Sequence, residues 1–156
     1  MPSLFERQHR IVVLGGGPGG YEAALAGAQF GADVTLVERV GVGGSAVLTD
    51  VVPSKTLIAT AEAAGAIGDA TDLGVQFFAR GESGRSVKPE VTVNLRAVNQ
   101  RLLRRARQQS EDMKQQLVKA GVRIVVGDGR LDGPQRVVVS GGSGKERTDV
   151  DTCDAD

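Results

Sequence analysis

Cysteine, histidine and the aromatic residues are scarce in this chain of 156 residues. It has one cysteine, one histidine, one tyrosine and no tryptophan. A single cysteine, Cys153, excludes an internal disulfide framework and is typical of cytosolic proteins, so a cytoplasmic location is expected. The lone histidine, His9, and the scattered acidic residues have no spacing that would hold a metal ion, and no metal site is expected.

An excess of charge of either sign is also missing, and so are long apolar runs. Nineteen basic residues balance nineteen acidic ones, so no attraction to nucleic acid or to an anionic membrane is expected. No apolar run approaches the roughly 18 residues that a membrane span needs. The first ten residues lack the apolar core of a signal peptide. The length is enough for one good hydrophobic core, or for one domain and a little more.

Glycine, by contrast, is abundant, with 22 residues, and five of them lie around Pro18 in the run GGGPGG at positions 15–20. The apolar residues 11–14 precede this run and predict a buried strand, and the Ala-rich residues 21–30 that follow predict a helix. Residues 34–37 predict a second strand, which ends at the acidic Glu38. Strand, glycine turn, helix, strand and acid follow one another in the order of a Rossmann dinucleotide site. A glycine-rich loop without a ligand is the alternative.

Each glycine of the GxGxxG pattern has a distinct expected role. Gly15 allows the tight turn out of the strand, Gly17 lets the backbone approach a pyrophosphate, and Gly20 lets the helix pack closely on the sheet. The helix is expected to begin at about Pro18 to Gly20, with its free N–H groups toward the phosphates. Glu38 is placed to bind an adenosine ribose, and its charge would repel a 2′-phosphate. The pattern alone does not distinguish FAD from NAD.

Further elements are predicted along the rest of the chain. Ser45 is expected to cap a helix over 46–67 that bends near Pro53. Residues 68–90 are expected to form a connection with little regular structure, and Pro89 and Glu90 to open a long helix that ends at Gly121. A strand is predicted over 122–126, and a small β-hairpin or meander over 131–144. Five arginines on the long helix indicate a solvated basic face rather than a phosphate-binding patch: Arg96, Arg101, Arg104, Arg105 and Arg107.

A second motif occupies residues 43–55, with the sequence GGSAVLTDVVPSK. Together with GGGPGG it resembles the pyridine nucleotide-disulfide oxidoreductases, the flavoprotein family of lipoamide dehydrogenase and glutathione reductase. The family pattern is GGTCLNVGCIPSK, and the matching residues are Gly43, Gly44, Pro53, Ser54 and Lys55. The resemblance covers the whole chain, and it implies an α/β fold: a Rossmann-like FAD-binding domain in which a parallel sheet has flanking helices and a small β-meander.

The resemblance also implies roles for individual residues, with FAD as the cofactor of the GxGxxG site. The glycine turn would cradle the pyrophosphate, Glu38 would bind the adenosine ribose, and Gly44 and Ser45 would lie along the phosphates and ribityl chain. The backbone of residues 127–129 would contact the adenine. Lys55 would be the catalytic residue, a cation near the flavin edge that stabilises negative charge on the reduced ring; a solvated helix lysine is the alternative. The implied cofactor-binding residues are Gly15, Gly17, Pro18, Gly19, Gly20, Glu38, Arg39, Gly43, Gly44, Ser45, Lys55, Gly127, Asp128 and Gly129.

The chain departs from the family at the two redox cysteines, which are replaced by Ala46 and Val51. Neither residue can form a thiolate, so the disulfide relay is absent, and Cys153 is about a hundred residues away in sequence. The resemblance therefore narrows to relatives that lack the cysteine pair and act as NAD(P)H:quinone reductases. The expected function is electron transfer from NAD(P)H through FAD to a quinone or similar acceptor. The alternatives are a dihydrolipoamide dehydrogenase-type disulfide reductase and a non-catalytic FAD-binding module.

The resemblance further implies that residues 1–156 are the N-terminal segment of an FAD-binding domain. The family adds an NAD(P)H domain and a dimerisation domain, and no second GxGxxG occurs here. The parent protein is therefore expected to be a homodimer with NAD(P)H as co-substrate. A Rossmann sheet that lacks a strand would expose an unpaired edge, so this segment is expected to be less stable alone.

Overall fold

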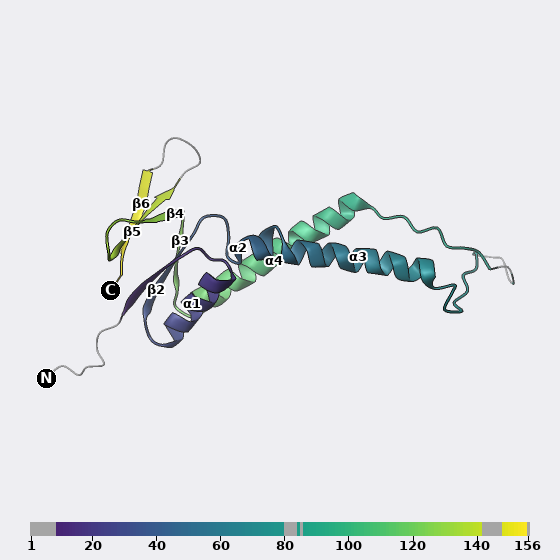
Figure 1. Cartoon of the computed structure of the whole chain (residues 1–156), viewed down its shortest axis with the longest axis horizontal. Helices are drawn as coiled ribbons and strands as arrows, with labels where there is room; N and C mark the ends of the chain where they lie inside the picture. Colours follow the sequence, from purple (N-terminus) through teal and green to yellow (C-terminus); the bar gives the residue numbers. More distant parts are fainter. Residues whose placement is uncertain (1–8, 80–83, 85, 142–147, 156) are drawn as a thin grey trace.

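The computed structural model describes residues 9–79, 84, 86–141 and 148–155. The strands and the first helix gather at one end of the molecule, and two long helices, α3 and α4, extend from them toward the other end (Figure 1). The two glycine motifs lie where these two parts meet.

Three parallel strands form the central sheet. They are β1 (Arg10–Leu14), β2 (Asp33–Glu38) and β3 (Arg123–Val126), in the order β1-β2-β3. Val34, Leu36 and Val37 of the central strand are all buried, because this strand is covered on both faces, as is usual in parallel sheets. Leu14 pairs with Val37, and Glu38 pairs with Val126, so the carboxyl ends of the three strands lie at one edge of the sheet.

Helix α1 (Pro18–Gln29) covers one face of this sheet together with the end of α4. It begins at Pro18, as expected, because proline has no N–H to lose in a first helical turn. The side-chain hydroxyl of Tyr21 donates to the side-chain oxygen of Gln116 and so ties α1 to α4. The core on this face is formed by Tyr21, Ala24, Val34, Leu36, Val42, Leu117 and Val122.

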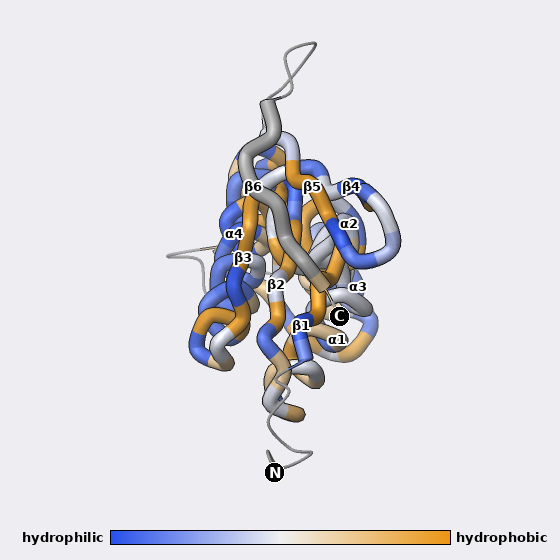
Figure 2. The backbone as a smooth tube through the Cα atoms, turned by 90° about the vertical axis from the view of Figure 1, so that its left-hand side faces the viewer, coloured by the Kyte–Doolittle hydropathy of each residue, from blue (hydrophilic) through white to orange (hydrophobic). Residues whose placement is uncertain are grey.

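The opposite face of the sheet is covered by a three-stranded antiparallel meander. Its strands are β4 (Asp128–Leu131), β5 (Arg136–Gly141) and β6 (Thr148–Asp154), in sequence order. Val137 and Val139 of β5 pack against Val37, and this cluster forms a second core. Figure 2 shows the resulting apolar colouring along β2 and β5. The expected Rossmann-like sheet with flanking helices and a small meander is confirmed; residues 142–144 of the predicted meander lie outside the described residues.

The predicted helix over 46–67 is wrong in its start and its continuity. The structure has two helices, α2 (Gly44–Leu48) and α3 (Val51–Asp69), separated by Thr49 and Asp50. The break comes at Asp50, whose φ of −125° and ψ of −90° are not helical, and not at Pro53. Pro53 is tolerated because it lies in the first turn of α3.

The predicted cap at Ser45 is also wrong. The residue before α2 is Gly43, with a φ of +99°, and no side chain caps this helix. Ser45 lies one residue inside α2, where its carbonyl oxygen accepts hydrogen bonds from the N–H groups of Thr49 and Asp50.

Helix α4 (Leu95–Lys119) begins five residues later than the expected start at Pro89 and Glu90. Asn94 sets this start, because its side-chain oxygen accepts a hydrogen bond of 3.0 Å from the N–H of Ala97. The helix ends before Gly121, whose φ of +89° confirms the predicted terminator. The arginines of the predicted basic face are all exposed: Arg96, Arg101, Arg104, Arg105 and Arg107.

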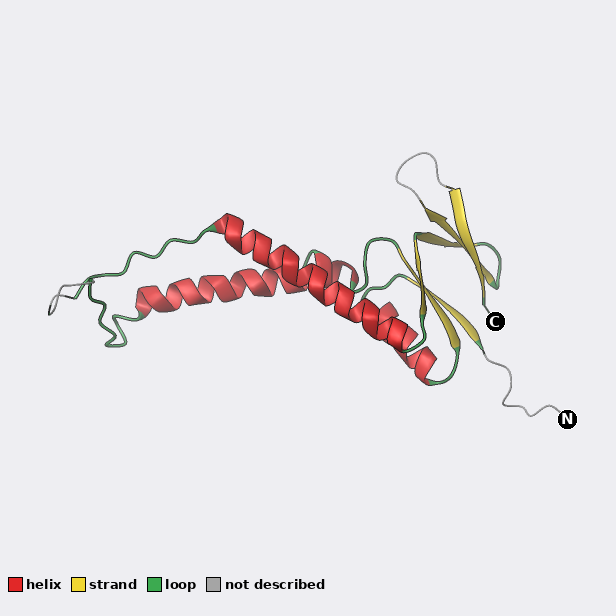
Figure 3. Cartoon of the chain, turned by 180° about the vertical axis from the view of Figure 1, so that it is seen from behind, coloured by secondary structure: helices red, strands yellow, loops and turns green. Residues whose placement is uncertain are grey.

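Helices α3 and α4 run side by side and project from the sheet (Figure 3). The connection between them has little regular structure in its described residues, as expected, apart from one bridge between Phe78 and Ser86. The site at the carboxyl ends of the strands therefore lies at the base of this projection.

Candidate functional site

A pocket of about 290 Å³ lies at the carboxyl ends of β1 and β2. Its walls come from three segments that are distant in sequence: the end of β1, the end of β2 and the turn into β4. Six of the expected cofactor-binding residues line it, together with Leu14 and Val37, which sequence reasoning missed because they read as ordinary strand residues. The expected residues that line it are Gly15, Glu38, Arg39, Gly127, Asp128 and Gly129.

The glycine turn has the backbone geometry that its sequence predicts. Gly15 has a φ of +91°, and its N–H donates to the carbonyl oxygen of Val37 at 2.8 Å. A Cβ on Gly20 would lie 1.9 Å from the carbonyl oxygen of Gly15, so only glycine allows α1 to approach the strand this closely. A Cβ on Gly17 would meet no atom within 4 Å. The space above Gly17 is thus open, as a pyrophosphate would require.

Glu38 is held in place by backbone N–H groups. One carboxylate oxygen accepts from Gly16 at 2.6 Å, and the other accepts from Val40 at 2.7 Å and from Gly41 at 3.1 Å. Burial raises the pKa of Glu38, but the hydrogen bonds from Val40, Gly16 and Gly41 outweigh it and leave the pKa below its ordinary value. The side chain is therefore a carboxylate at neutral pH, fixed beside the pocket.

Gly16 is a functional residue that the pattern reading missed. The GxGxxG pattern leaves this position free, yet the N–H of Gly16 holds Glu38, and a Cβ here would lie 3.1 Å from the nearer carboxylate oxygen. The signal that could have found it is the unbroken run of three glycines at 15–17.

The second glycine motif contacts the first directly. The N–H of Gly43 donates to the carbonyl oxygen of Gly16 at 2.6 Å. A Cβ on Gly44, whose φ is +56°, would lie 3.0 Å from the Cα of Gly17. Gly16 and Gly44 are 28 positions apart in sequence. These contacts nevertheless bring the two motifs together into one glycine-lined surface at the start of α1.

The turn into β4 forms the wall opposite the end of β2. The N–H of Gly127 donates to the carbonyl oxygen of Glu38 at 3.0 Å, which fixes this turn on β2. A Cβ on Gly129 would lie 2.5 Å from the side chain of Leu14, so the start of β4 packs directly against this lining residue of the pocket. Arg39 and Asp128 form an ion pair of 3.3 Å between the two walls.

Comparison with known proteins agrees with this geometry. The family model of pyridine nucleotide-disulphide oxidoreductases matches residues 9–153. An NAD(P)H dehydrogenase (quinone) of Mycobacterium tuberculosis is 38% identical over 125 residues, which are 78% of this chain and 24% of that protein. A dihydrolipoyl dehydrogenase of Acholeplasma laidlawii is 32% identical over 141 residues, 90% of this chain and 39% of that protein. The crystal structure of LpdA from Mycobacterium tuberculosis superposes with a TM-score of 0.75 at 32% identity, over 94% of this chain and 30% of LpdA.

The chain belongs to the pyridine nucleotide-disulphide oxidoreductase family. It spans about a quarter to two fifths of the length of these curated relatives. Proteins of this family generally bind FAD.

Ala46 lies within α2 and Val51 is the first residue of α3, so neither of the two positions at which the resemblance to the family predicts a redox cysteine has a thiol. Lys55, the expected catalytic residue, is exposed one turn after Val51 and does not line the pocket. The other expected cofactor-binding residues of the two glycine motifs also lie outside the pocket lining: Gly17, Pro18, Gly19, Gly20, Gly43, Gly44 and Ser45.

Among the described residues, no group of three or more histidine, cysteine, aspartate or glutamate side chains is arranged to hold a metal ion. None of the helices in this part of the chain combines the length and apolar character needed to cross a membrane.

Proposed function

We propose that the pocket binds the adenosine end of FAD and that the whole protein transfers electrons from NAD(P)H through FAD to a quinone or similar acceptor. The single observation that carries the proposal is the convergence at one strand edge of both glycine motifs, the fixed Glu38 carboxylate and the turn at 127–129.

The residues present fit the cofactor. Gly17 leaves room for a phosphate, and the first turn of α1 offers its N–H groups and the positive end of the helix dipole. Glu38 would accept hydrogen bonds from ribose hydroxyl groups, because it lines the pocket and backbone donors keep its side chain in place. The backbone at Gly127 to Gly129 would contact the adenine. Gly43, Gly44 and Ser45 would continue the site along the phosphates and ribityl chain.

Bound FAD supplies the redox chemistry, a two-electron path between NAD(P)H and the acceptor. Lys55 is proposed to lie near the flavin edge, where its positive charge would stabilise the reduced state. Ala46 and Val51 provide no thiolate, so the electrons would pass directly to the acceptor, which as a quinone takes up two electrons and two protons. The quinone dehydrogenase among the relatives supports this choice of acceptor.

The wider organisation is part of the same proposal. Residues 1–156 would be the N-terminal portion of the FAD-binding domain, and the NAD(P)H site and the dimer interface would lie in other parts of a homodimeric parent. The relatives are two and a half to four times as long as the matched region, which agrees with this arrangement.

A disulfide reductase is the second candidate, because dihydrolipoyl dehydrogenases are among the relatives. The missing thiols at Ala46 and Val51 oppose it, since a thiolate must attack the substrate disulfide. A non-catalytic FAD-binding module is the third candidate. Only a test for catalytic turnover of NAD(P)H and an acceptor distinguishes it from the proposed enzyme.

The first test is an absorption spectrum of the purified chain after incubation with FAD and desalting. Flavin bands retained by the wild type and lost in Gly17→Ala are expected; no retained flavin and no ADP-ribose binding would contradict the cofactor proposal. In the parent protein, NAD(P)H-dependent reduction of a benzoquinone is expected, without reduction of lipoamide. Lipoamide turnover at ordinary rates would favour the disulfide reductase, and flavin binding without any turnover would favour the module.

A further inference from the structure

Two adjacent residues at the end of β2, Glu38 and Arg39, favour opposite forms of the adenosine ribose, without and with a 2′-phosphate. An acidic residue there, such as Glu38, favours a ribose with a free 2′-hydroxyl. An arginine near the same strand end, such as Arg39, is the residue type that binds a 2′-phosphate in related dinucleotide sites. From the sequence, Glu38 is expected to repel a 2′-phosphate, but Arg39 beside it would attract one if its side chain reached the ribose.

The structure separates the two side chains. Glu38 points inward to the N–H groups of Gly16, Val40 and Gly41 and is half-buried. Arg39 is 69% exposed, and its Nη1 donates to Oδ1 of Asp128 at 3.3 Å. Asp128 is 28% exposed and comes from the opposite wall, at the start of β4. Both partners of this ion pair line the pocket.

We propose that Asp128 is a specificity-determining residue, which holds Arg39 away from the ribose so that the pocket selects adenosine nucleotides without a 2′-phosphate. The inference rests on the proposed function, because it assumes that an adenosine ribose binds beside Glu38. With Arg39 paired to Asp128, the three side chains carry a net charge of −1, and a 2′-phosphate would meet the Glu38 carboxylate without a free cation to bind it.

Loss of the ion pair between Arg39 and Asp128 is expected to remove this selectivity. The guanidinium matches phosphate geometry and stays charged at all relevant pH values, so Arg39 freed from Asp128 would bind a 2′-phosphate. The effect is expected to be moderate because Glu38 remains in place and the ion pair is partly exposed.

The experiment measures the dissociation constants of ADP-ribose and 2′-phospho-ADP-ribose, which differ only in the phosphate. For each variant, the selectivity is the dissociation constant of the phosphorylated ligand divided by that of the unphosphorylated one. In Asp128→Asn the selectivity is expected to fall about fivefold, the size of a partly exposed charge interaction. Asp128→Ser provides a second removal of the charge if the asparagine variant does not fold.

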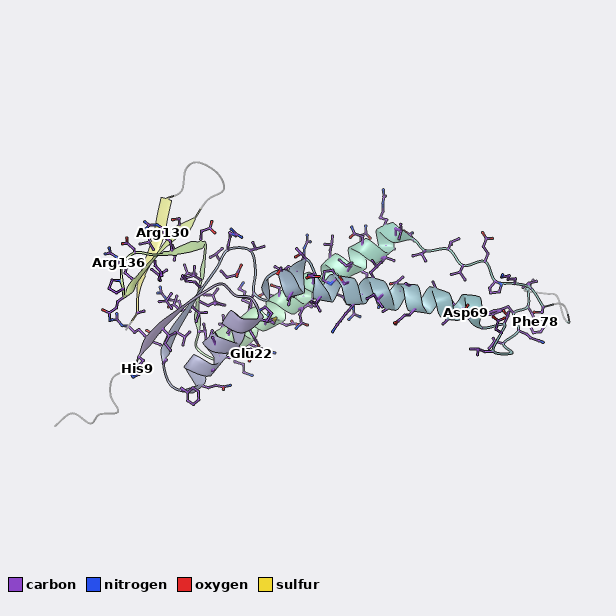
Figure 4. The ribbon with its side chains drawn as sticks, viewed as in Figure 1. His9, Glu22, Asp69, Phe78, Arg130 and Arg136 are labelled. Atoms are coloured by element: carbon purple, nitrogen blue, oxygen red, sulfur yellow. The ribbon has the colours of Figure 1, made fainter. Side chains whose placement is uncertain are left out.

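A double variant separates release of Arg39 from simple loss of a negative charge. If Asp128 holds Arg39 away from the ribose, Arg39→Gln changes the selectivity little in the wild-type background and raises it about fivefold in the Asp128→Asn background. If the two charges act independently, Arg39→Gln raises the selectivity equally in both backgrounds, and the inference is overturned. Arg130→Gln is the matched control, because it removes a neighbouring ion pair of 3.6 Å with Asp132, on the same meander but outside the pocket (Figure 4).

The outcomes also separate this inference from the proposed function. Unchanged selectivity in Asp128→Asn, with ADP-ribose and FAD still bound, overturns the role of Asp128 and leaves the cofactor proposal intact. Failure of the wild type to bind either ADP-ribose or FAD overturns both.

Discussion

At the scale of single residues, Glu38 connects the fold to the site. Its carboxylate organises the loop of residues 39–41 and the glycine turn through backbone donors, and Glu38 also lines the pocket. Under the proposed function Glu38 would therefore have both a structural and a binding role, and its structural role can be tested through pH.

The stabilising contribution of Glu38 should depend on pH in a defined direction. Its pKa in the folded protein is below the ordinary 4.5, so the contribution is fully present above that value and is lost as pH falls through the lower folded value. In urea unfolding, Glu38→Gln is expected to be less stable than the wild type by about 1 kcal/mol at pH 7. The difference should shrink below pH 4.5. A constant difference from pH 7 to pH 3 would contradict this account.

Gly17 and Gly20 should respond differently to the same substitution. In Gly20→Ala the new Cβ overlaps the carbonyl oxygen of Gly15, so a loss of about 2 to 3 kcal/mol in unfolding free energy is expected. In Gly17→Ala the Cβ enters open space, so stability should be unchanged while FAD affinity falls at least about tenfold. Urea unfolding and FAD titration of both variants check this. Unchanged FAD affinity in Gly17→Ala would show that the space at Gly17 has no binding role, and equal destabilisation of both variants would contradict the open space found there.

At the scale of elements, the sequence predicts those strands and helix ends that are determined by the local residue pattern and by glycine or proline. The strands, the start of α1 at Pro18 and the end of α4 before Gly121 agree with their predictions, because each is set by neighbouring residues. The predicted helix runs through the split between α2 and α3, because the residues on both sides are helical and only the backbone at Asp50 interrupts them. The contact of Gly16 with Glu38 joins residues 22 apart in sequence, which local pattern cannot reveal.

The start of α4 gives a prediction at this scale. Asn94 caps the helix through the N–H of Ala97, so Asn94→Ala should lower the unfolding free energy by about 1 kcal/mol, and Asn94→Asp should retain it. Hydrogen exchange at residues 96–98 should accelerate in the alanine variant alone. Ser45→Ala is the matched control: it removes a helical serine whose side chain makes no cap, so no comparable loss is expected. A larger loss at Ser45 than at Asn94 would reverse the assignment of the two caps.

At the scale of the whole molecule, the parallel sheet is covered on both faces but not along the edge that β1 forms. Within the described residues β1 pairs with β2 and with no other strand, and its Ile11 and Leu14 are 38% and 42% exposed. The projecting helices also carry exposed apolar side chains, among them Leu57, Ile58 and Leu103. A strand edge and apolar surface of this kind are usually covered in stable domains.

Under the proposal that residues 1–156 belong to a longer flavoprotein, the parent should therefore be more stable than this chain. A further parallel strand beside β1 would pair with its outer edge and cover Ile11 and Leu14, whose burial contributes about 25 cal/mol per Å² of apolar surface. The urea midpoint of the isolated chain is expected to be lower than that of the parent, and hydrogen exchange in β1 should be faster than in β2. Equal midpoints and equal protection of the two strands would mean that β1 needs no further partner, and the proposed division of the FAD-binding domain would fail with it.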